Sequence, residues 1–140
     1  TGLDPQVRRM IWQRLRELRQ AGKTLLLTTH YMDEAERLCD DLVVIDEGRI
    51  VARGAPRDLI RRHVEAEVVE VEGEAAALDA LAAALRGTRT ERVGETLYCY
   101  TDQLGPVLQR LEALPGLTWR HRPATLEDVF LRITGHELRE

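Results

Sequence analysis

The first half of the chain shows two kinds of hydrophobic spacing. Apolar residues first recur every three or four positions, which predicts an amphipathic helix that begins at Asp4-Pro5 and ends at Gly22. The apolar stripe of this helix consists of Val7, Ile11, Leu15 and Leu18. Residues 24–29 are then continuously apolar instead of alternating, which is typical of a strand buried on both faces. Such strands are usually parallel and covered by helices, so the pattern favours an α/β arrangement.

An acidic helix follows the predicted strand. Its first turn or so holds three carboxylates, which favour the helix macrodipole there: Asp33, Glu34 and Glu36. Its apolar face consists of Met32, Ala35, Leu38 and Cys39. Residues 42–45 predict a second apolar strand, which continues through a turn at 46–49 into a hairpin with residues 50–54. Pro56 starts a short helix that runs to Arg62.

The composition changes near His63. Residues 64–72 alternate valine or alanine with glutamate, which predicts a strand, and the adjacent pair Val68-Val69 breaks the alternation and predicts a β-bulge. The remaining pattern predicts a helix over 74–86, a hairpin of residues 88–93 and 96–101, a helix over 103–114, a short strand over 117–122 and a final helix from Thr125. The order β-α-β-β-α-β over 64–122 is that of a split βαβ, or ferredoxin-like, unit.

Composition and charge exclude several classes of protein. The 140 residues are 44% hydrophobic and 31% charged, which describes a folded globular chain rather than a disordered one. No apolar run approaches the roughly 18 residues of a membrane span. The net charge of −4 gives no reason to expect a nucleic-acid partner. No metal site is expected, because neither the two cysteines nor the histidines downstream have ligand spacing: Cys39, Cys99, His63, His121 and His136.

Two polar residues stand where chemistry is expected. His30 ends the predicted buried strand, and ligands of open α/β sheets bind outside the carboxyl ends of the strands. Asp4 immediately precedes the first helix. Taken singly, Asp4 is explained as an N-cap and His30 as a structural histidine at a strand end, so neither residue alone predicts a function.

Taken together, these residues carry a resemblance to a known family. Thr1-Gly2-Leu3-Asp4 resembles the D-loop of an ABC-transporter ATP-binding domain, residues 27–40 resemble its switch-histidine loop and the following helix, and residues 45–56 resemble its closing hairpin. The resemblance implies an α/β fold class. The chain would be the C-terminal portion of a P-loop-type nucleotide-binding domain, with parallel strands, helices and a closing β-hairpin, followed by a small α+β ferredoxin-like domain.

The resemblance also implies roles for individual residues. In the family, the histidine that matches His30 contacts the γ-phosphate of ATP and the attacking water in a closed dimer, so His30 is the expected catalytic residue. An imidazole suits this role because one ring nitrogen can donate to phosphate while a neighbour holds the other. The aspartate that matches Asp4 works across the dimer interface. Gly2, Leu3, Asp4 and His30 are therefore the expected cofactor-binding residues, with ATP and Mg2+ as cofactors.

Several segments that ATP hydrolysis requires in this family are absent from the 140 residues. The chain contains no G-x-x-x-x-G-K-[ST] phosphate loop, no glutamine loop and no LSGGQ-like stretch. It also lacks the Asp-Glu pair of Walker B, which in the family lies just before the residue that matches Thr1. We therefore expect a fragment that begins after the catalytic carboxylate and that is inactive by itself.

A segment near the C-terminus indicates a subfamily within this family. Residues 125–135 resemble the C-terminal end of ATP-binding subunits from ABC-2-type exporters, which include drug- and antibiotic-export ATPases. This implies an ABC-2-type membrane permease as a partner, a second ATP-binding subunit in a homo- or heterodimer, and a cytoplasmic location on the inner face of the membrane. Residues 1–62 are the expected ATP-binding part, and residues 63–140 are an accessory domain with a regulatory or dimer-supporting role.

Two other functions stay open at this point. One is a regulatory or dimerisation module without ATPase activity, in which the ferredoxin-like half binds a small ligand and residues 1–62 are a remnant. The other is a free-standing hydrolase with His30 as its base. The second is less consistent with the sequence, because the chain contains no serine and no plausible cysteine nucleophile.

Overall fold

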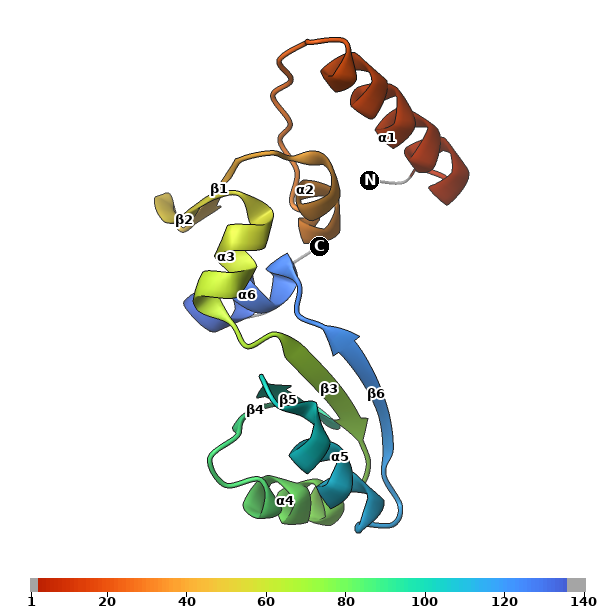
Figure 1. Cartoon of the computed structure of the whole chain (residues 1–140), viewed down its shortest axis with the longest axis vertical. Helices are drawn as coiled ribbons and strands as arrows, with labels where there is room; N and C mark the ends of the chain where they lie inside the picture. The colour runs from red at the N-terminus through yellow and green to blue at the C-terminus, as the bar shows by residue number, and fades with distance from the viewer. Residues whose placement is uncertain (1–2, 136–140) are drawn as a thin grey trace.

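The structure, a computed structural model, describes residues 3–135 of the chain. This part is α/β, and its helices and strands are interspersed along the sequence (Figure 1). The helices are α1 (Pro5–Gln20), α2 (Met32–Leu38), α3 (Pro56–His63), α4 (Ala75–Ala84), α5 (Leu104–Glu112) and α6 (Leu126–Thr134). The strands are β1 (Leu42–Asp46), β2 (Arg49–Gly54), β3 (Glu67–Glu72), β4 (Arg89–Val93), β5 (Thr96–Thr101) and β6 (Thr118–Pro123).

Helix α1 forms as predicted but buries a different face. The Asp4 carboxylate accepts a hydrogen bond from the Gln6 backbone N–H at 2.9 Å, so the predicted N-cap is confirmed. The predicted apolar stripe is not the buried one, because Val7 and Ile11 are each 42% exposed. Trp12 is the residue of α1 that is buried. The main packing partner of α1 is the short helix α2, and the side of α1 that meets α2 is the side that carries Trp12.

Residues 24–29 do not form the buried strand that their pattern predicts. They make an extended connection between α1 and α2, in which the Leu26 side chain is 98% exposed. The physical reason is the lack of a pairing partner, because a strand requires a neighbouring strand for its ladder of hydrogen bonds. The expected parallel strands are also wrong for the described residues, since every strand pair there is antiparallel.

Strands β1 and β2 form the predicted hairpin. Both central residues of its turn have positive φ, 49° at Glu47 and 75° at Gly48, which is the geometry of a tight two-residue hairpin turn. Val44 and Ala52 pair across the two strands and point into the core. Ile45 and Ile50 are each 65% exposed on the hairpin.

The second half has the predicted ferredoxin-like topology. Its four strands are antiparallel in the order β4-β5-β3-β6, and α4 and α5 lie together on one face of this sheet (Figure 1). The predicted bulge at Val68-Val69 is wrong, because the pairing continues without a shift from Val68 opposite Tyr100 to Val69 opposite Cys99. Both valines are buried because both faces of β3 are covered here. A valine on each face needs no extra residue in the strand.

Two hydrophobic clusters account for this arrangement. One lies between the sheet and the helices α4 and α5, and it includes Val69, Val71, Leu78, Leu81 and Val107. The other lies on the opposite face of the sheet and joins it to α3, α6 and the β1–β2 hairpin. Its members are Val44, Ala52, Leu59, Val64, Val68, Tyr100, Ala124, Leu126, Val129 and Phe130, with Met32 and Ala35 of α2 packed against them.

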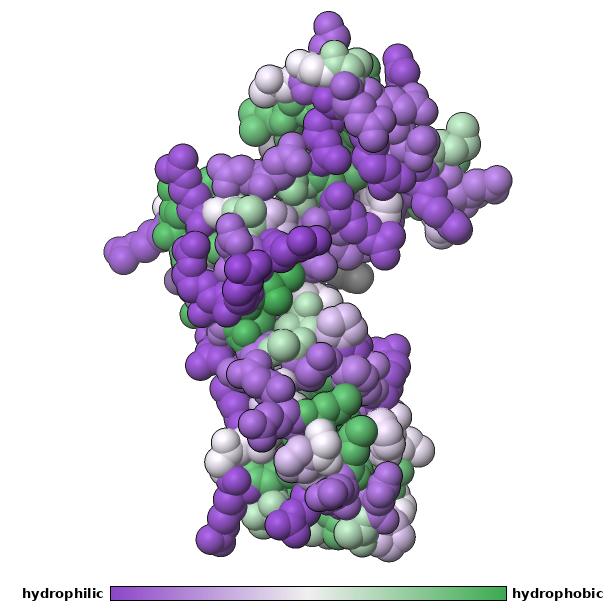
Figure 2. Space-filling view, viewed as in Figure 1, coloured by the Kyte–Doolittle hydropathy of each residue, from purple (hydrophilic) through white to green (hydrophobic). Residues whose placement is uncertain are grey.

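Exposed apolar side chains lie among hydrophilic ones on the surface of the molecule (Figure 2). Hydrophilic residues predominate over the upper part, which contains α1 and α2, with hydrophobic residues showing between them (Figure 2). The most exposed large apolar side chains include Leu26, Met10, Ile45 and Ile50. None of the described helices combines the length and the hydrophobicity that crossing a membrane requires.

Candidate functional site

The structure places His30 on an exposed corner directly before α2. Its side chain is exposed, and its ring lies against that of Tyr31 with the centroids 4.3 Å apart. Leu3 and Asp4 are exposed at the N-terminus of α1, whereas Gly2 lies outside the described residues. No hydrogen bond or ion pair joins Asp4 to His30 in the described part of the chain. The two predicted site residues therefore occupy the ends of two elements that meet through other side chains.

Glu34 is the side chain that connects those two elements. Its Oε2 accepts a hydrogen bond from Trp12 Nε1 on α1 at 2.8 Å. Its Oε1 accepts one from the Thr29 hydroxyl at 2.8 Å, and the same hydroxyl oxygen accepts the Tyr31 backbone N–H at 3.0 Å. Thr29 and Tyr31 are the residues on either side of His30. The backbone around His30 is thus held by a hydrogen-bonded bridge that begins on α1.

Two arginines surround the Trp12 ring. The guanidinium carbon of Arg8 lies 6.0 Å from the centroid of this ring and 5.1 Å from that of Tyr31, and the guanidinium carbon of Arg37 lies 5.4 Å from the Trp12 centroid. These distances are within the range of attractive cation–π contacts. They add a second, non-hydrogen-bonded attachment between α1 and the His30 corner.

Trp12 and Glu34 are not among the residues for which the sequence predicts a function. In the sequence, Glu34 is one of several carboxylates in the first turn of a predicted helix, and Trp12 lies beside the apolar stripe rather than on it. A signal was available, since an indole N–H that is to be buried needs an acceptor. The sequence could not identify that acceptor, because Trp12 and Glu34 are 22 positions apart.

Helix α2 is also attached to the last helix of the described chain. The Glu36 carboxylate accepts the backbone N–H of Leu126, the first residue of α6, at 2.8 Å. Met32 and Ala35 of α2 pack on the same cluster as Leu126 and Val129. The helix that follows His30 therefore rests on α1 through one face and on α6 through another.

The contact between Glu36 and α6 leads to a stability prediction. We expect Glu36→Ala to lower the free energy of unfolding by about 1–2 kcal/mol, because it leaves a helix N-terminal N–H without its side-chain acceptor. Glu36→Gln keeps an acceptor oxygen and is expected to stay within about 0.5 kcal/mol of the parent. Urea unfolding of the two variants measures the difference. Equal midpoints for Glu36→Ala and the parent would show that this contact contributes nothing.

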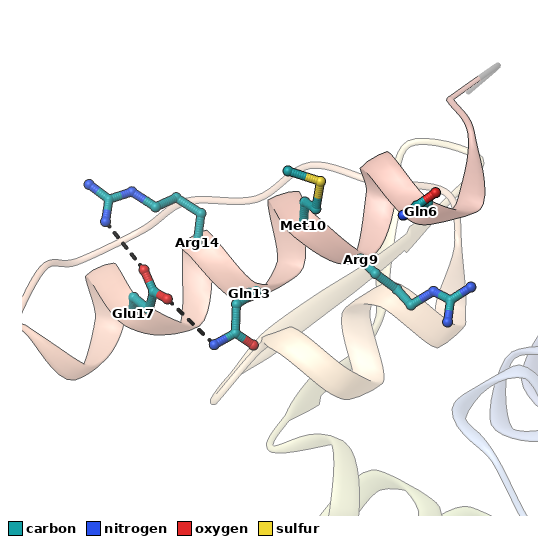
Figure 3. A pocket seen from close by; sticks show the side chains of 6 residues that line it. All are labelled: Gln6, Arg9, Met10, Gln13, Arg14 and Glu17. Atoms are coloured by element: carbon teal, nitrogen blue, oxygen red, sulfur yellow. Dashed lines mark hydrogen bonds and ion pairs between the residues drawn. The ribbon is translucent and has the colours of Figure 1, made fainter.

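A shallow surface depression lies along α1, and His30 is not among the residues that line it. It is lined by six side chains that stand on one outward side of the helix: Gln6, Arg9, Met10, Gln13, Arg14 and Glu17 (Figure 3). The Glu17 carboxylate accepts from Arg14 at 3.3 Å and from Gln13 at 3.4 Å. Since its polar groups pair along the helix itself, this depression offers no converging set of ligand-binding groups.

The described residues fit the expected cofactors unequally. His30 presents an exposed imidazole that can donate to a phosphate oxygen. Within residues 3–135, no group of three or more His, Cys, Asp or Glu side chains is placed to hold a metal ion. His121 binds the Glu67 carboxylate, and His136 lies outside the described residues. Burial raises the pKa of the Cys99 thiol to about 11, which keeps it protonated at neutral pH.

The chain is similar to one protein family and to several proteins of the same name. The family model described as "Nodulation factor export protein NodI, C-terminal domain" matches residues 58–135. The protein named "Nod factor export ATP-binding protein I" from Ralstonia nicotianae (strain ATCC BAA-1114 / GMI1000) is 54% identical over 147 residues, which cover 100% of this chain and 46% of that protein. The protein of the same name from Burkholderia thailandensis is 54% identical over 140 residues, which cover 100% of this chain and 46% of that protein.

A third relative extends the comparison to another genus. The protein of the same name from Cupriavidus pinatubonensis (strain JMP 134 / LMG 1197) is 53% identical over 142 residues, covering 100% of this chain and 43% of that protein. The chain thus spans about half the length of the curated relatives it matches. The resemblance to an ATP-binding subunit of an ABC exporter is confirmed by these matches. With more than half of its residues matched by one family model, the chain belongs to the family of the C-terminal domain of the nodulation factor export protein NodI.

Proposed function

We propose that the chain is the C-terminal part of the ATP-binding subunit of an ABC exporter, in which ATP hydrolysis drives transport through a separate membrane permease. The observation that carries this proposal is the placement of His30. It is exposed on a corner that α1, α2 and their hydrogen bonds hold in place, in a chain related over its whole length to proteins named for ATP-binding and export. An exposed imidazole on a fixed corner can meet a phosphate group without a large rearrangement of the fold.

In this proposal, His30 contacts the γ-phosphate and the attacking water, and Asp4 with Gly2 and Leu3 works at the interface between two ATP-binding subunits. Phosphoryl transfer depends mainly on positioning and on stabilising negative charge, which suits a hydrogen-bond donor on a fixed corner. ATP and Mg2+ are the cofactors, and the residues that bind most of the nucleotide and the metal belong to a part of the protein upstream of this chain.

The proposed partners follow from the same assignment. They are an ABC-2-type permease and a second ATP-binding subunit, identical or paralogous, with the complex on the cytoplasmic face of the membrane. We propose residues 1–62 as the nucleotide-binding part and residues 63–140 as the accessory domain. The hydrophobic cluster that α3 and the hairpin share with α6 and the sheet supports a close mechanical connection between these two parts.

The test compares this chain with its upstream-extended form. We expect the extended protein to bind and hydrolyse ATP, and the 140-residue chain alone to show no turnover. The upstream coding sequence should also contain Walker A, LSGGQ-like and Walker B segments within about 150 residues, the length of one domain. If those segments are missing, or if the extended, folded protein does not bind ATP, the proposal is wrong.

A further inference from the structure

The hydrogen bonds around His30 place Glu34 at the centre of a chain of contacts. A carboxylate has two oxygens, and each oxygen of Glu34 is used by a donor from a different segment: the Trp12 indole from α1 and the Thr29 hydroxyl from the loop before His30. The two donor groups are each 2.8 Å away. The carboxylate therefore fixes the distance between α1 and this loop.

The Thr29 hydroxyl carries the restraint across His30. It donates to Glu34 and accepts the N–H of Tyr31 at 3.0 Å, so both of its hydrogen-bonding functions are engaged. A bond from a threonine side chain to the N–H two residues later closes a tight local turn. His30 is the residue enclosed by that turn, and its backbone direction depends on the position of the Thr29 side chain.

The surroundings keep Glu34 in the form that this arrangement needs. Partial burial alone would raise the pKa of Glu34. The hydrogen bonds from Trp12 and Thr29, together with the positive charge of Arg8, outweigh that effect, so the pKa of this carboxyl lies below its ordinary value. Glu34 is consequently charged at neutral pH, and a carboxylate can accept both hydrogen bonds at once.

We propose that Glu34 is a positioning residue for His30, which it aligns through the Thr29 hydroxyl while anchoring the loop to Trp12 of α1. The effect of Glu34 on ATP turnover rests on the proposed function. Glu34 does not touch the nucleotide, and it affects turnover only through the orientation of His30. Asp4 caps the same helix α1 that carries Trp12. The network therefore also ties the N-terminus of α1, where the second subunit is proposed to bind, to the histidine.

The functional test uses matched variants in the upstream-extended protein. Glu34→Ala removes the network, and Asp33→Ala removes the neighbouring exposed carboxylate from the same turn of α2. Thr29→Val removes the hydroxyl, and Thr29→Ser keeps it. We expect Glu34→Ala and Thr29→Val to lower kcat by roughly 10-fold to 100-fold, the scale of a misplaced reacting group, with ATP affinity unchanged. Asp33→Ala and Thr29→Ser should behave like the parent.

A double-mutant cycle separates positioning from general destabilisation. Since Glu34 acts through His30, Glu34→Ala should cause no further loss of kcat in a His30→Ala background. A Glu34→Ala loss that is undiminished in that background would overturn the proposal. So would a loss caused equally by Asp33→Ala, because removal of a carboxylate from α2 would then be sufficient.

A second measurement does not depend on ATP turnover. In NMR spectra of the folded protein, Glu34→Ala and Thr29→Val should both shift the His30 ring resonances and the Trp12 indole N–H resonance, and Asp33→Ala should shift neither. Unchanged His30 resonances in Glu34→Ala would overturn the positioning role. Shifted resonances in a protein without ATP turnover would instead contradict the proposed function and leave the positioning role standing.

Discussion

Replacing His30 by alanine in the upstream-extended protein should lower ATP turnover by about 10²-fold to 10³-fold, while ATP affinity stays within about twofold of the parent. This magnitude is that of removing one hydrogen-bond donor aimed at the charge that develops in a transition state. Little loss of affinity is expected because the imidazole would contact only one end of the nucleotide. Phosphate release at saturating ATP, together with equilibrium binding of a fluorescent ATP analogue, measures the two quantities separately.

A suitable control for this experiment is His121→Ala. His121 is also exposed, but it lies on β6 of the ferredoxin-like sheet and binds Glu67. It should leave both turnover and affinity unchanged. The assigned role of His30 would be contradicted if His30→Ala abolished ATP binding while turnover per bound nucleotide remained at the parent value.

Asp128→Ala should produce the largest loss of stability among single substitutions of charged residues. Asp128 is 4% exposed, and its two oxygens accept hydrogen bonds from Arg122 at 2.7 and 2.9 Å. Oδ2 also accepts from the Thr125 backbone N–H at 2.8 Å, which completes the capping box of α6. Removing the carboxylate leaves a half-buried guanidinium without its main partner. We expect a loss of about 3 kcal/mol in the free energy of unfolding.

The matched control for Asp128 is Asp79→Ala. Asp79 binds Arg92 at 2.8 Å, a distance similar to that of the Asp128–Arg122 pair, but its side chain is 74% exposed. We expect a loss below about 1 kcal/mol, because water screens exposed ion pairs. In the buried pair, by contrast, hydrogen bonding by Asp128 raises the pKa of Arg122, so the pairing favours the charged guanidinium. Equal losses for the two variants in guanidinium unfolding would contradict the importance assigned to burial.

The ferredoxin-like half could be predicted from the sequence because its signals are local. Alternation over residues 64–72 identified the strand, and the order of the following elements identified the topology. The prediction of a β-bulge at Val68-Val69 is wrong, because that prediction assumes that only one face of the strand is covered. In the structure α6 packs against the second face, and the position of that helix depends on contacts far away in sequence.

The failure at residues 24–29 has a different origin. A continuously apolar segment is suited to burial on both faces. A strand also needs neighbouring strands, however, and no described strand pairs with this segment. The position of His30 at the corner before α2 was predictable from the change in pattern after Thr29. The Trp12–Glu34–Thr29 network was not, because its central contact joins two helices whose relative orientation no local pattern fixes.

The central claim is that His30 meets the γ-phosphate of ATP, and a structure of the upstream-extended protein with Mg2+ and a non-hydrolysable ATP analogue tests it most directly. The measured quantity is the distance between a ring nitrogen of His30 and the nearest γ-phosphate oxygen. The proposed function predicts a hydrogen bond of about 2.7–3.2 Å, with the Thr29 and Trp12 contacts to Glu34 intact. A bound analogue whose γ-phosphate is held by other groups, with the His30 ring turned toward solvent, would contradict it.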